Sequence, residues 1–327
     1  MTERLESIRW ARKLKMRHLE VLLVLCKLRS ITAAANEMHM TQPAVSHWLA
    51  DLEEVIGQAL FVRGRQLSLT QAGEVLKRHA ERMLGDVGRV NEELASVGMG
   101  MTGRLHIGSI ISATPALLPQ AIARVQAHSP QLRLQVSEAT FDPLLERLRR
   151  RELDLIISPL HVNAIKSGFK SELLIEDTVS VVVRPGHPIL ALPTPRWSDV
   201  AQLPWVMPPA DTLMRKQLEA AFHTAGLPVP VPRIEAASLV VIQMILRQGD
   251  YIGVLASSVI PVYRQMGLIE VVELTPCVDF GPIGMMWDAE AEDSKLLAFA
   301  DALRTVAASL RGEVQSEDPN GPTISSA

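Results

Sequence analysis

The side chains best suited to chemistry lie in one short run, from Thr41 to Ala50. Within and just beyond this run, apolar residues recur at helical spacing and predict a buried stripe of Val45, Trp48, Leu49, Leu52 and Ile56. The opposite face carries small, mostly polar side chains, namely Gln42, Pro43, Ser46, His47 and Ala50. Short hydrogen-bonding groups at the N-terminal end of a helix suit contact with base edges in the major groove of DNA.

Two helices joined by a tight turn would hold this face in place. We expect Thr32 to cap the first helix and Thr41 to cap the second, because a hydroxyl just before a helix satisfies an unpaired amide. His39 and Met40 form the turn between them. An apolar stripe over residues 17–30 predicts one more helix before these two, so the N-terminal part is expected to contain three helices.

A turn flanked by two short strands is predicted after the second of these helices. The strands are Phe61–Arg63 and Leu67–Leu69, an arrangement typical of a wing. Arg63 and Arg65 near its tip can lie along a phosphate strand or reach a minor groove. Solvation without any contact is the alternative, but phosphate contacts dominate protein–DNA interfaces.

Residues 70–97 predict a single long helix. Six apolar residues step along it by three and four, the spacing of a coiled coil: Ala80, Met83, Val87, Val90, Leu94 and Val97. Such a seam needs a partner, either the body of the protein or a second copy of the helix, and the second copy is the simpler answer. Because a dimer would place two recognition helices on DNA, the operator should contain an inverted repeat.

The glycine-rich segment Gly98–Gly103 separates this helix from the rest of the chain. It matches the dinucleotide-binding pattern GxGxxG only formally, because a helix precedes it and a strand follows it, so it is interpreted as a hinge. Strands and helices then alternate from Arg104 to Ser158, which predicts a parallel sheet. A second α/β unit and a return strand over residues 282–287 complete a two-lobed body.

Single hydroxyls follow the first three strands of this body. Ser112, Thr140 and Ser158 could converge on one cleft, beside helix N-termini that favour anions. Pro208 and Ser238 are placed to close the cleft from the second lobe. A capping or turn role is the alternative for each hydroxyl. These loops contain no lysine or arginine, which favours a monocarboxylate, an aromatic acid or a sugar acid over a doubly charged ligand.

This succession of elements resembles the LysR-type transcriptional regulators. The residues that carry the resemblance are Ser30, Thr32-Ala33-Ala34-Ala35, Thr41-Gln42-Pro43-Ala44-Val45-Ser46, Leu52-Glu53, Gly57, Leu60-Phe61 and Leu69-Thr70 with Gly73. The chain departs from the family in two places. The family commonly has an arginine where this chain has His47, and the wing is slightly short.

The resemblance implies an α/β chain with an N-terminal all-α winged helix-turn-helix and a two-lobed, periplasmic-binding-protein-like effector domain. It implies a bacterial homodimer or homotetramer, paired through the linker helix, that binds operator DNA and acts on RNA polymerase. In the family, positions corresponding to Ser112, Thr140 and Ser158 line the effector pocket. Thr32 is expected on the DNA backbone. A small-molecule effector, and no further cofactor, is expected.

The expected domain boundaries follow from these elements. They are an N-terminal extension over 1–15, the winged helix-turn-helix over 16–69, a linker helix over 70–97, a hinge over 98–103, an effector domain over 104–310 and a disordered tail over 311–327. Within the effector domain, lobe 1 covers about 104–178 and 276–310, and lobe 2 covers about 179–275.

Composition limits the remaining alternatives. Residues 1–90 carry 14 basic and 10 acidic side chains, a balance of +4, whereas the remainder carries 19 and 26, a balance of −7. A basic end on an acidic body indicates that the N-terminal part meets phosphates.

The cysteine and histidine content argues against two further kinds of site. The sequence has only two cysteines, which excludes a disulfide framework, and it has no HExxH or HxxxH pair, which argues against a metal site. No apolar run is long enough to span a bilayer, so a cytoplasmic location without membrane contact is expected.

An enzyme, or a binding protein without DNA activity, are the rival classes. The sequence has no nucleophile elbow, no P-loop, no His/Cys cluster and no convincing acid pair. No catalytic residue is therefore predicted.

Overall fold

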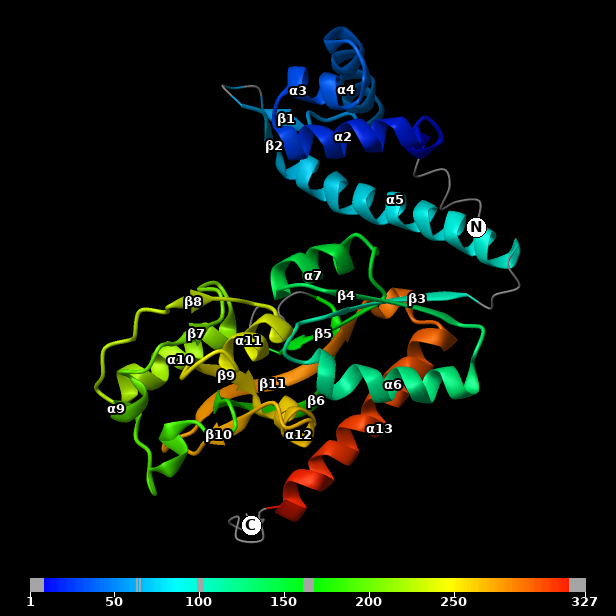
Figure 1. Cartoon of the computed structure of the whole chain (residues 1–327). Helices are drawn as coiled ribbons and strands as arrows, with labels where there is room; N and C mark the ends of the chain where they lie inside the picture. Colours follow the sequence, from blue (N-terminus) through cyan, green and yellow to red (C-terminus); the bar gives the residue numbers. More distant parts are fainter. Residues whose placement is uncertain (1–8, 63, 65, 99–102, 161–167, 318–327) are drawn as a thin grey trace, which may run out of the picture. The chain divides into compact units, whose positions relative to one another are not determined.

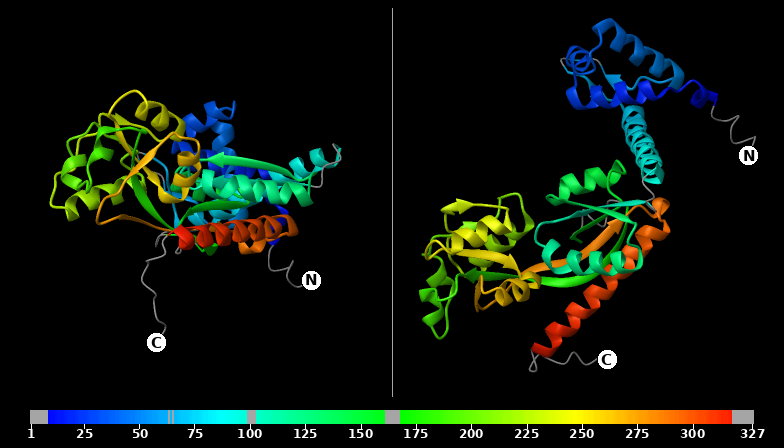
Figure 2. Two further views of the ribbon diagram at one scale, coloured as in Figure 1. Left: turned by 60° about the horizontal axis from the view of Figure 1, so that its bottom comes forward. Right: turned by 45° about the vertical axis from the view of Figure 1, so that its right-hand side comes forward.

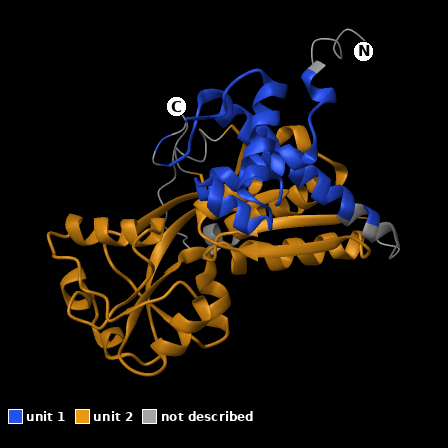
Figure 3. Ribbon diagram, turned by 90° about the horizontal axis from the view of Figure 1, so that it is seen from above, with its two compact units in different colours: residues 1–100, 149–152 blue, residues 101–148, 153–327 orange. Residues whose placement is uncertain are grey.

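The computed structural model describes residues 9–62, 64, 66–98, 103–160 and 168–317. These residues form two compact units, one of residues 1–100 with 149–152 and the other of residues 101–148 with 153–327 (Figure 3). Four predicted features lie wholly or partly outside the described ranges: residues 1–8 of the N-terminal extension, the wing residues Arg63 and Arg65, the hinge residues 99–102, and the tail from residue 318. Within the described ranges, no helix is long and apolar enough to cross a membrane.

The first unit is the expected winged helix-turn-helix followed by a long helix (Figure 1). Its elements are η1 Arg9–Arg12, α2 Met16–Leu28, α3 Ile31–Glu37, α4 Gln42–Ile56, β1 Phe61–Val62, β2 Ser68–Leu69 and α5 Gln71–Gly98. Strands β1 and β2 pair antiparallel and form the base of the wing. The core joins α2, α3 and α4 through fully buried side chains such as Leu22, Ala34 and Leu52.

The helix caps follow the predicted chemistry with one exception. Thr41 caps α4, since its hydroxyl accepts from the Ala44 amide at 3.4 Å. The predicted cap at Thr32 is wrong: Ser30 precedes α3 and accepts from the Ala33 amide at 3.3 Å. Both hydroxyls suit the role, and Ser30 takes it because its backbone is extended while Thr32 is already helical. Thr32 is therefore exposed on the first turn of α3.

Helix α5 is a single long helix, as predicted (Figure 2), and part of its apolar seam is exposed. Ala80, in the N-terminal half of α5, is buried in the core of the first unit. Further along, exposure rises from 42% at Met83 and 48% at Val87 to 55% at Val90 and 68% at Leu94. A row of exposed aliphatic side chains at heptad spacing is typical of a helix that pairs with another helix.

The second unit is built on a seven-stranded mixed sheet with the order β10-β6-β11-β5-β3-β4, and β9 also pairs with β6. Its first lobe contains β3 Arg104–Ser109, α6 Thr114–His128, β4 Arg133–Glu138, α7 Phe141–Arg149 and β5 Leu155–Pro159. Strand β3 pairs in parallel with both β4 and β5, as the βαβαβ pattern predicts. Helices α6 and α13 (Ser294–Glu317) pack side by side in this lobe (Figures 1 and 2).

The second lobe has its own smaller core around Val206, Ile242 and Leu255. Its elements are η2 Pro188–Ala191, α9 Trp197–Val200, β7 Val206–Met207, α10 Leu213–Thr224, β8 Ile234–Glu235, α11 Leu239–Leu246, β9 Ile252–Ala256, η3 Ser257–Val259, α12 Ile260–Gln265 and β10 Glu270–Val272. Strands β7 and β8 are a short parallel pair. The chain then returns through β11 Val278–Trp287 and η4 Ala289–Ala291 to α13.

Two long strands join the lobes. Strand β6, Lys170–Val183, pairs with β11 along most of its length and with β9 and β10 at its C-terminal end. It begins at Lys170, nine residues before Val179, the expected start of lobe 2, so this one strand runs through both lobes. The expected disordered tail over 311–327 is wrong for residues 311–317, because α13 continues as a helix to Glu317.

Candidate functional site

The outward face of α4 has the composition that its spacing predicts. Gln42, Pro43, His47 and Ala50 are exposed and Ser46 is half-buried, whereas the facing stripe contains the fully buried residues Val45, Leu49 and Leu52. The face is thus made of short side chains on a helix whose other side is fixed in the core. Such a surface can approach base pairs closely.

A buried histidine holds α4 against α2. His18 is 0% exposed, and its Nε2 lies 2.9 Å from the Asp51 carboxylate on α4. Its Nδ1 accepts from the Lys15 amide at 3.1 Å, so the ring proton resides on Nε2 and is donated to Asp51. This hydrogen bond lowers the pKa of the Asp51 carboxyl. The edge of the His18 ring also packs on Trp48, with the ring centroids 5.1 Å apart.

The end of α4 is tied to the wing in a similar way. The Glu53 carboxylate accepts from the amides of Leu60 at 2.7 Å and Phe61 at 3.3 Å. Thr70 caps α5 by accepting from the Gly73 amide, and its hydroxyl donates to the Ala59 carbonyl at 2.7 Å. The recognition face and the base of the wing are therefore held by one set of hydrogen bonds. Arg63 and Arg65, predicted on the backbone or minor groove, lie outside the described residues.

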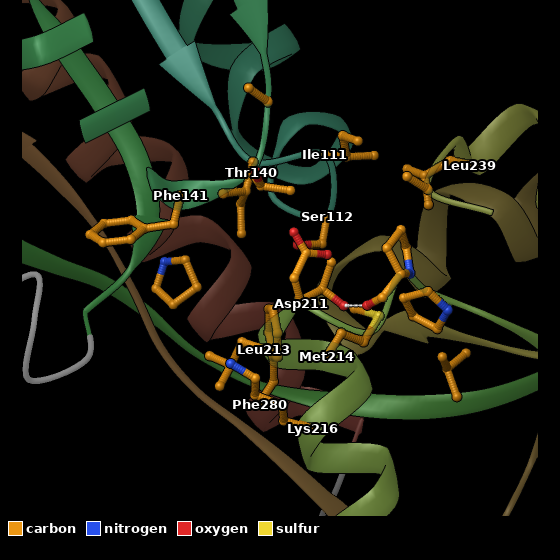
Figure 4. Close-up of a pocket in the computed structure, with 18 of the residues that line it drawn as sticks. Ile111, Ser112, Thr140, Phe141, Asp211, Leu213, Met214, Lys216, Leu239 and Phe280 are labelled. Atoms are coloured by element: carbon orange, nitrogen blue, oxygen red, sulfur yellow. Dashed lines mark hydrogen bonds between the residues drawn. The ribbon is translucent and has the colours of Figure 1, made fainter. Parts of the chain in front are cut away.

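A cavity of about 270 Å³ lies between the two lobes of the second unit, at the carboxyl ends of β3, β4 and β5 (Figure 4). From the first lobe it is lined by residues 110–112, 139–142 and Pro159, and from the second lobe by segments within 208–216 and 236–242. Val254 of β9 and Phe280 of β11 complete the lining. This edge of the sheet is where α/β folds of open topology bind ligands.

Four helices begin at this cavity. Thr212 and Ser238 cap α10 and α11 with their hydroxyls, which accept from the amides of Arg215 at 3.3 Å and Val241 at 3.4 Å. Helix α6 begins at Thr114, and its N-cap residue Ala113 provides no side-chain cap. Helix α7 begins at Phe141, which itself lines the cavity. Helix N-termini carry unpaired amides and the positive end of the helix dipole, so their convergence favours an anion.

Most of the cavity wall is apolar, with a few polar groups at defined places. Figure 4 shows Ser112 and Thr140 of the first lobe and Asp211, Leu213 and Met214 of the second lobe around one space. Among the described lining residues, the ionisable side chains are Asp142, Asp211 and Lys216. A ligand with an apolar body and one charged end matches this wall.

The predicted pocket residues fall into two groups. Ser112, Thr140 and Pro208 line the cavity. Ser158 is fully buried with its hydroxyl 3.7 Å from the Met286 sulfur, one residue before the lining residue Pro159. Ser238 is exposed and caps α11, between the lining residues Ala237 and Leu239. Ser158 and Ser238 are therefore next to residues that line the cavity but do not line it themselves.

Most residues that line the cavity were not predicted from the sequence, and Lys216 and Phe280 are two of them. Lys216 supplies an ammonium group that the loops lack, because it stands on α10 one turn beyond the loop that was searched. Phe280 reaches the cavity through a β-bulge: Asp279 pairs with Thr178 and Gly281 with Asp177, so Phe280 is the extra residue between them. Gly281, at φ 89°, supplies the left-handed conformation of this bulge. A heptad-like or alternating pattern does not reveal such a register change.

The bulge is backed by a buried carboxylate. Asp177 on β6 is 5% exposed, and it accepts from the Thr178 amide at 2.9 Å, the Ser258 amide at 3.1 Å and the Ser258 hydroxyl at 2.7 Å. Burial raises the pKa of the Asp177 carboxyl above its usual value, and the hydrogen bonds from Ser258 oppose this rise. Asp177 thus ties β6, one of the two strands that join the lobes, to η3 of the second lobe.

No group of three His, Cys, Asp or Glu side chains that could hold a metal ion occurs among the described residues. Cys26 is half-buried, and burial raises the pKa of its thiol to about 11. A thiol with a raised pKa is a poor nucleophile, so Cys26 belongs with the core of the DNA-binding unit.

Comparison with known proteins identifies both parts of the chain. The family model "LysR substrate binding domain" matches residues 99–308, and the model "Bacterial regulatory helix-turn-helix protein, lysR family" matches residues 16–74. The transcriptional regulator GbpR of Azospirillum brasilense is 32% identical over 279 residues, which cover 84% of this chain and 81% of GbpR. The transcriptional regulator GalR of Pseudomonas putida is 33% identical over 242 residues, which cover 74% of this chain and 61% of GalR.

Solved structures share the fold of the whole chain. The crystal structure of full-length CbnR complexed with its target DNA superimposes with a TM-score of 0.56 at 18% identity, and covers 90% of this chain and 100% of CbnR. Full-length BenM gives a TM-score of 0.52 at 21% identity over 94% of this chain and 100% of BenM. With a helix-turn-helix, a ligand cavity and two family models that together cover most of the sequence, the chain belongs to the LysR family of transcriptional regulators, which bind DNA and are not enzymes.

Proposed function

We propose that this regulator binds an inverted-repeat operator as a homodimer or homotetramer, and that a small organic acid in the interlobe cavity changes its DNA binding. Gln42, Pro43, Ser46 and His47 contact base edges in the major groove. Thr32, Arg63 and Arg65 contact phosphates or a minor groove. The observation that carries the proposal is the exposed, small and polar face of α4, whose other side is fixed in the core.

The exposed seam of α5 supports pairing of two chains. Four large aliphatic side chains, from Met83 to Leu94, are 42% to 68% exposed in a single chain. Packing against the same row of a second chain would remove this surface from water. Two recognition helices in one dimer match an operator of two-fold symmetry. Regulation of transcription makes RNA polymerase a further partner.

The chemistry of the cavity supports an acid as the effector. Four helix N-termini and Lys216 provide positive potential, while Ser112 and Thr140 provide hydroxyls. Because the rest of the wall is apolar and Asp142 and Asp211 add negative charge, one carboxylate on an apolar or cyclic body fits better than a dicarboxylate. Aromatic acids and sugar acids are both within this class. No cofactor beyond the effector is required, and the protein acts on chromosomal DNA in the cytoplasm of a bacterium.

In vitro selection of random duplexes with the full-length protein tests the DNA-binding half of the proposal. The selected sequences should contain an inverted repeat, and the Gln42→Ala/Ser46→Ala double variant should discriminate less between selected and scrambled duplexes. Each lost base contact is worth about 1–3 kcal/mol of discrimination. A double variant that protects the same operator with unchanged discrimination would exclude this face of α4 as the reader.

A thermal-shift screen of small acids tests the effector half. A ligand that binds only the folded protein raises the melting temperature, by an amount that grows with concentration over its dissociation constant. Monocarboxylates with an apolar body should raise it, and Lys216→Met should weaken that response. Equal responses of the parent and the Lys216→Met variant to every acid would rule out a charge-assisted contact with Lys216.

A further inference from the structure

We infer that Arg29, a residue outside both the recognition helix and the tip of the wing, binds a DNA phosphate and fixes the position of the DNA-binding unit on the duplex. The inference rests on the proposed DNA-binding function. It assigns a contact at the junction of α2, α3 and the wing.

The backbone of Arg29 has a conformation that costs an arginine free energy. Arg29 ends α2 with φ 52° and ψ 22°, and its amide donates to the Leu25 carbonyl at 2.8 Å. Glycine is the usual residue at such a left-handed helix end, because a Cβ atom is crowded there. Glycine would therefore form this turn with less strain. Compared with glycine, arginine adds a guanidinium group. A strained backbone at an exposed position therefore points to a role for this side chain.

Arg29 also lies where two DNA-contacting elements meet. Its carbonyl accepts from the Leu67 amide at 3.0 Å, which ties it to the wing. The next residue, Ser30, caps α3. In helix-turn-helix complexes the helix before the recognition helix crosses the DNA backbone, and a wing lies along the neighbouring groove. An exposed, long side chain between these two elements is within reach of the phosphates that lie between their contacts.

The guanidinium has no competing partner in the described part of the chain. Arg29 is exposed, and no carboxylate among the described residues forms an ion pair with it. By contrast, Arg17 on the same helix α2 is paired with Glu20 at 2.7 Å. An unpaired guanidinium presents five N–H donors in a planar fork that matches two phosphate oxygens.

The test compares full-length parent, Arg29→Gly, Arg29→Gln and Arg29→Lys on two probes, a duplex selected by the parent from a random pool and a scrambled duplex. Neutralising one phosphate contributes about 0.9 to the slope of log K against log salt. Arg29→Gly and Arg29→Gln should each lose about that slope per bound chain and bind about fivefold more weakly per chain at physiological salt. Arg29→Lys should keep the parental slope.

Because a phosphate contact carries no sequence information, the selected and scrambled duplexes should weaken by the same factor. The Arg29→Gly protein should melt no lower than the parent, since glycine suits this backbone. If Arg29→Gly does not fold, Arg29→Gln, which keeps a side chain on the parental backbone, carries the test. Arg247→Gln, an exposed arginine on the second unit, is the control for loss of one positive charge and should leave the slope unchanged.

Parental salt slopes for Arg29→Gly and Arg29→Gln would overturn the inference, as would an equal loss of slope in Arg247→Gln. A lower melting temperature of Arg29→Gly would overturn the argument that glycine suits the site. Failure of the parent to select any sequence would instead contradict the proposed function, so the two failures are distinguishable.

Discussion

At the scale of single residues, His47 is the side chain that most distinguishes this recognition helix. It is exposed on α4, one residue after Ser46 and one turn before Asp51. An imidazole is shorter than an arginine and cannot present a two-pronged fork to a guanine. The base pair that His47 contacts is therefore expected to differ from the preference of relatives with arginine there.

Substitution of His47 should alter specificity at one position of each half-site. His47→Ala should lose about 1–3 kcal/mol of discrimination at that base pair, and His47→Arg should shift the preference toward guanine. Duplex selection with each variant measures this change. Glu54→Ala, an exposed residue further along α4, is the control; identical selected sequences for the parent and both His47 variants would exclude His47 as a base contact.

Asp177 permits a prediction about pH. Burial raises the pKa of this carboxyl above its ordinary value of 3.8, so folding favours the protonated form. The stability associated with the neutral carboxyl is fully present below the unfolded-state pKa and is lost as the pH rises through the folded-state pKa. Asp177→Asn removes this titration, since the amide stays neutral while its oxygen still accepts from backbone amides.

The free energy of unfolding of the parent should therefore fall, relative to Asp177→Asn, as the pH rises from about 3.8 to the raised pKa. Urea unfolding of both proteins at closely spaced pH values measures the difference. Ser258→Ala, which removes one hydrogen bond to the charged form, should widen the difference. If the difference in the free energy of unfolding between the parent and Asp177→Asn stayed constant across this pH range, Asp177 would have the same pKa in the folded and the unfolded protein.

At the scale of elements, α5 offers the clearest prediction. Val90 is 55% exposed on the apolar seam, so Val90→Glu would place two like charges in the middle of a paired helix. The variant should dissociate into monomers at concentrations where the parent is a dimer or tetramer, and should lose operator binding. Analytical ultracentrifugation measures the first effect and gel shift the second.

Gly88→Glu is the matched control for this experiment. Gly88 is exposed on α5 about 100° around the helix from Val87 and so lies outside the seam, and a Cβ atom added there meets no other atom within 4 Å. Its substitution adds the same charge without touching the seam. Loss of assembly in Gly88→Glu, or parental assembly of Val90→Glu, would show that the seam is not the pairing surface.

Local spacing in the sequence predicts some elements and misses others. It predicts the buried stripe of α4, the cap at Thr41 and the apolar seam of α5. The cap at Ser30 was missed because Ser30 and Thr32 are chemically equivalent candidates two residues apart. The bulge at Phe280 and the approach of Lys216 depend on strand register and on chain segments distant in sequence, which periodicity does not encode.

At the scale of the whole molecule, the proposed effector and the operator DNA bind to different parts of one chain. An acid that binds the interlobe cavity more tightly in one arrangement of the lobes shifts the population toward that arrangement. If DNA also binds the two arrangements with different affinity, the same coupling free energy changes the affinity of the protein for DNA. The strands that join the lobes, β6 and β11, carry both the Phe280 bulge and Asp177, so the cavity and the interlobe connection share residues.

The most direct test is a footprint of the selected operator with and without an acid that raises the melting temperature. The parent should show a changed pattern or extent of protection when the acid is present. Ala237→Trp, which fills the cavity from an exposed position on its wall, should bind the same operator and show no response to the acid. A parental footprint that stays the same at saturating acid, or an equal response of Ala237→Trp, would contradict an effector switch in this cavity.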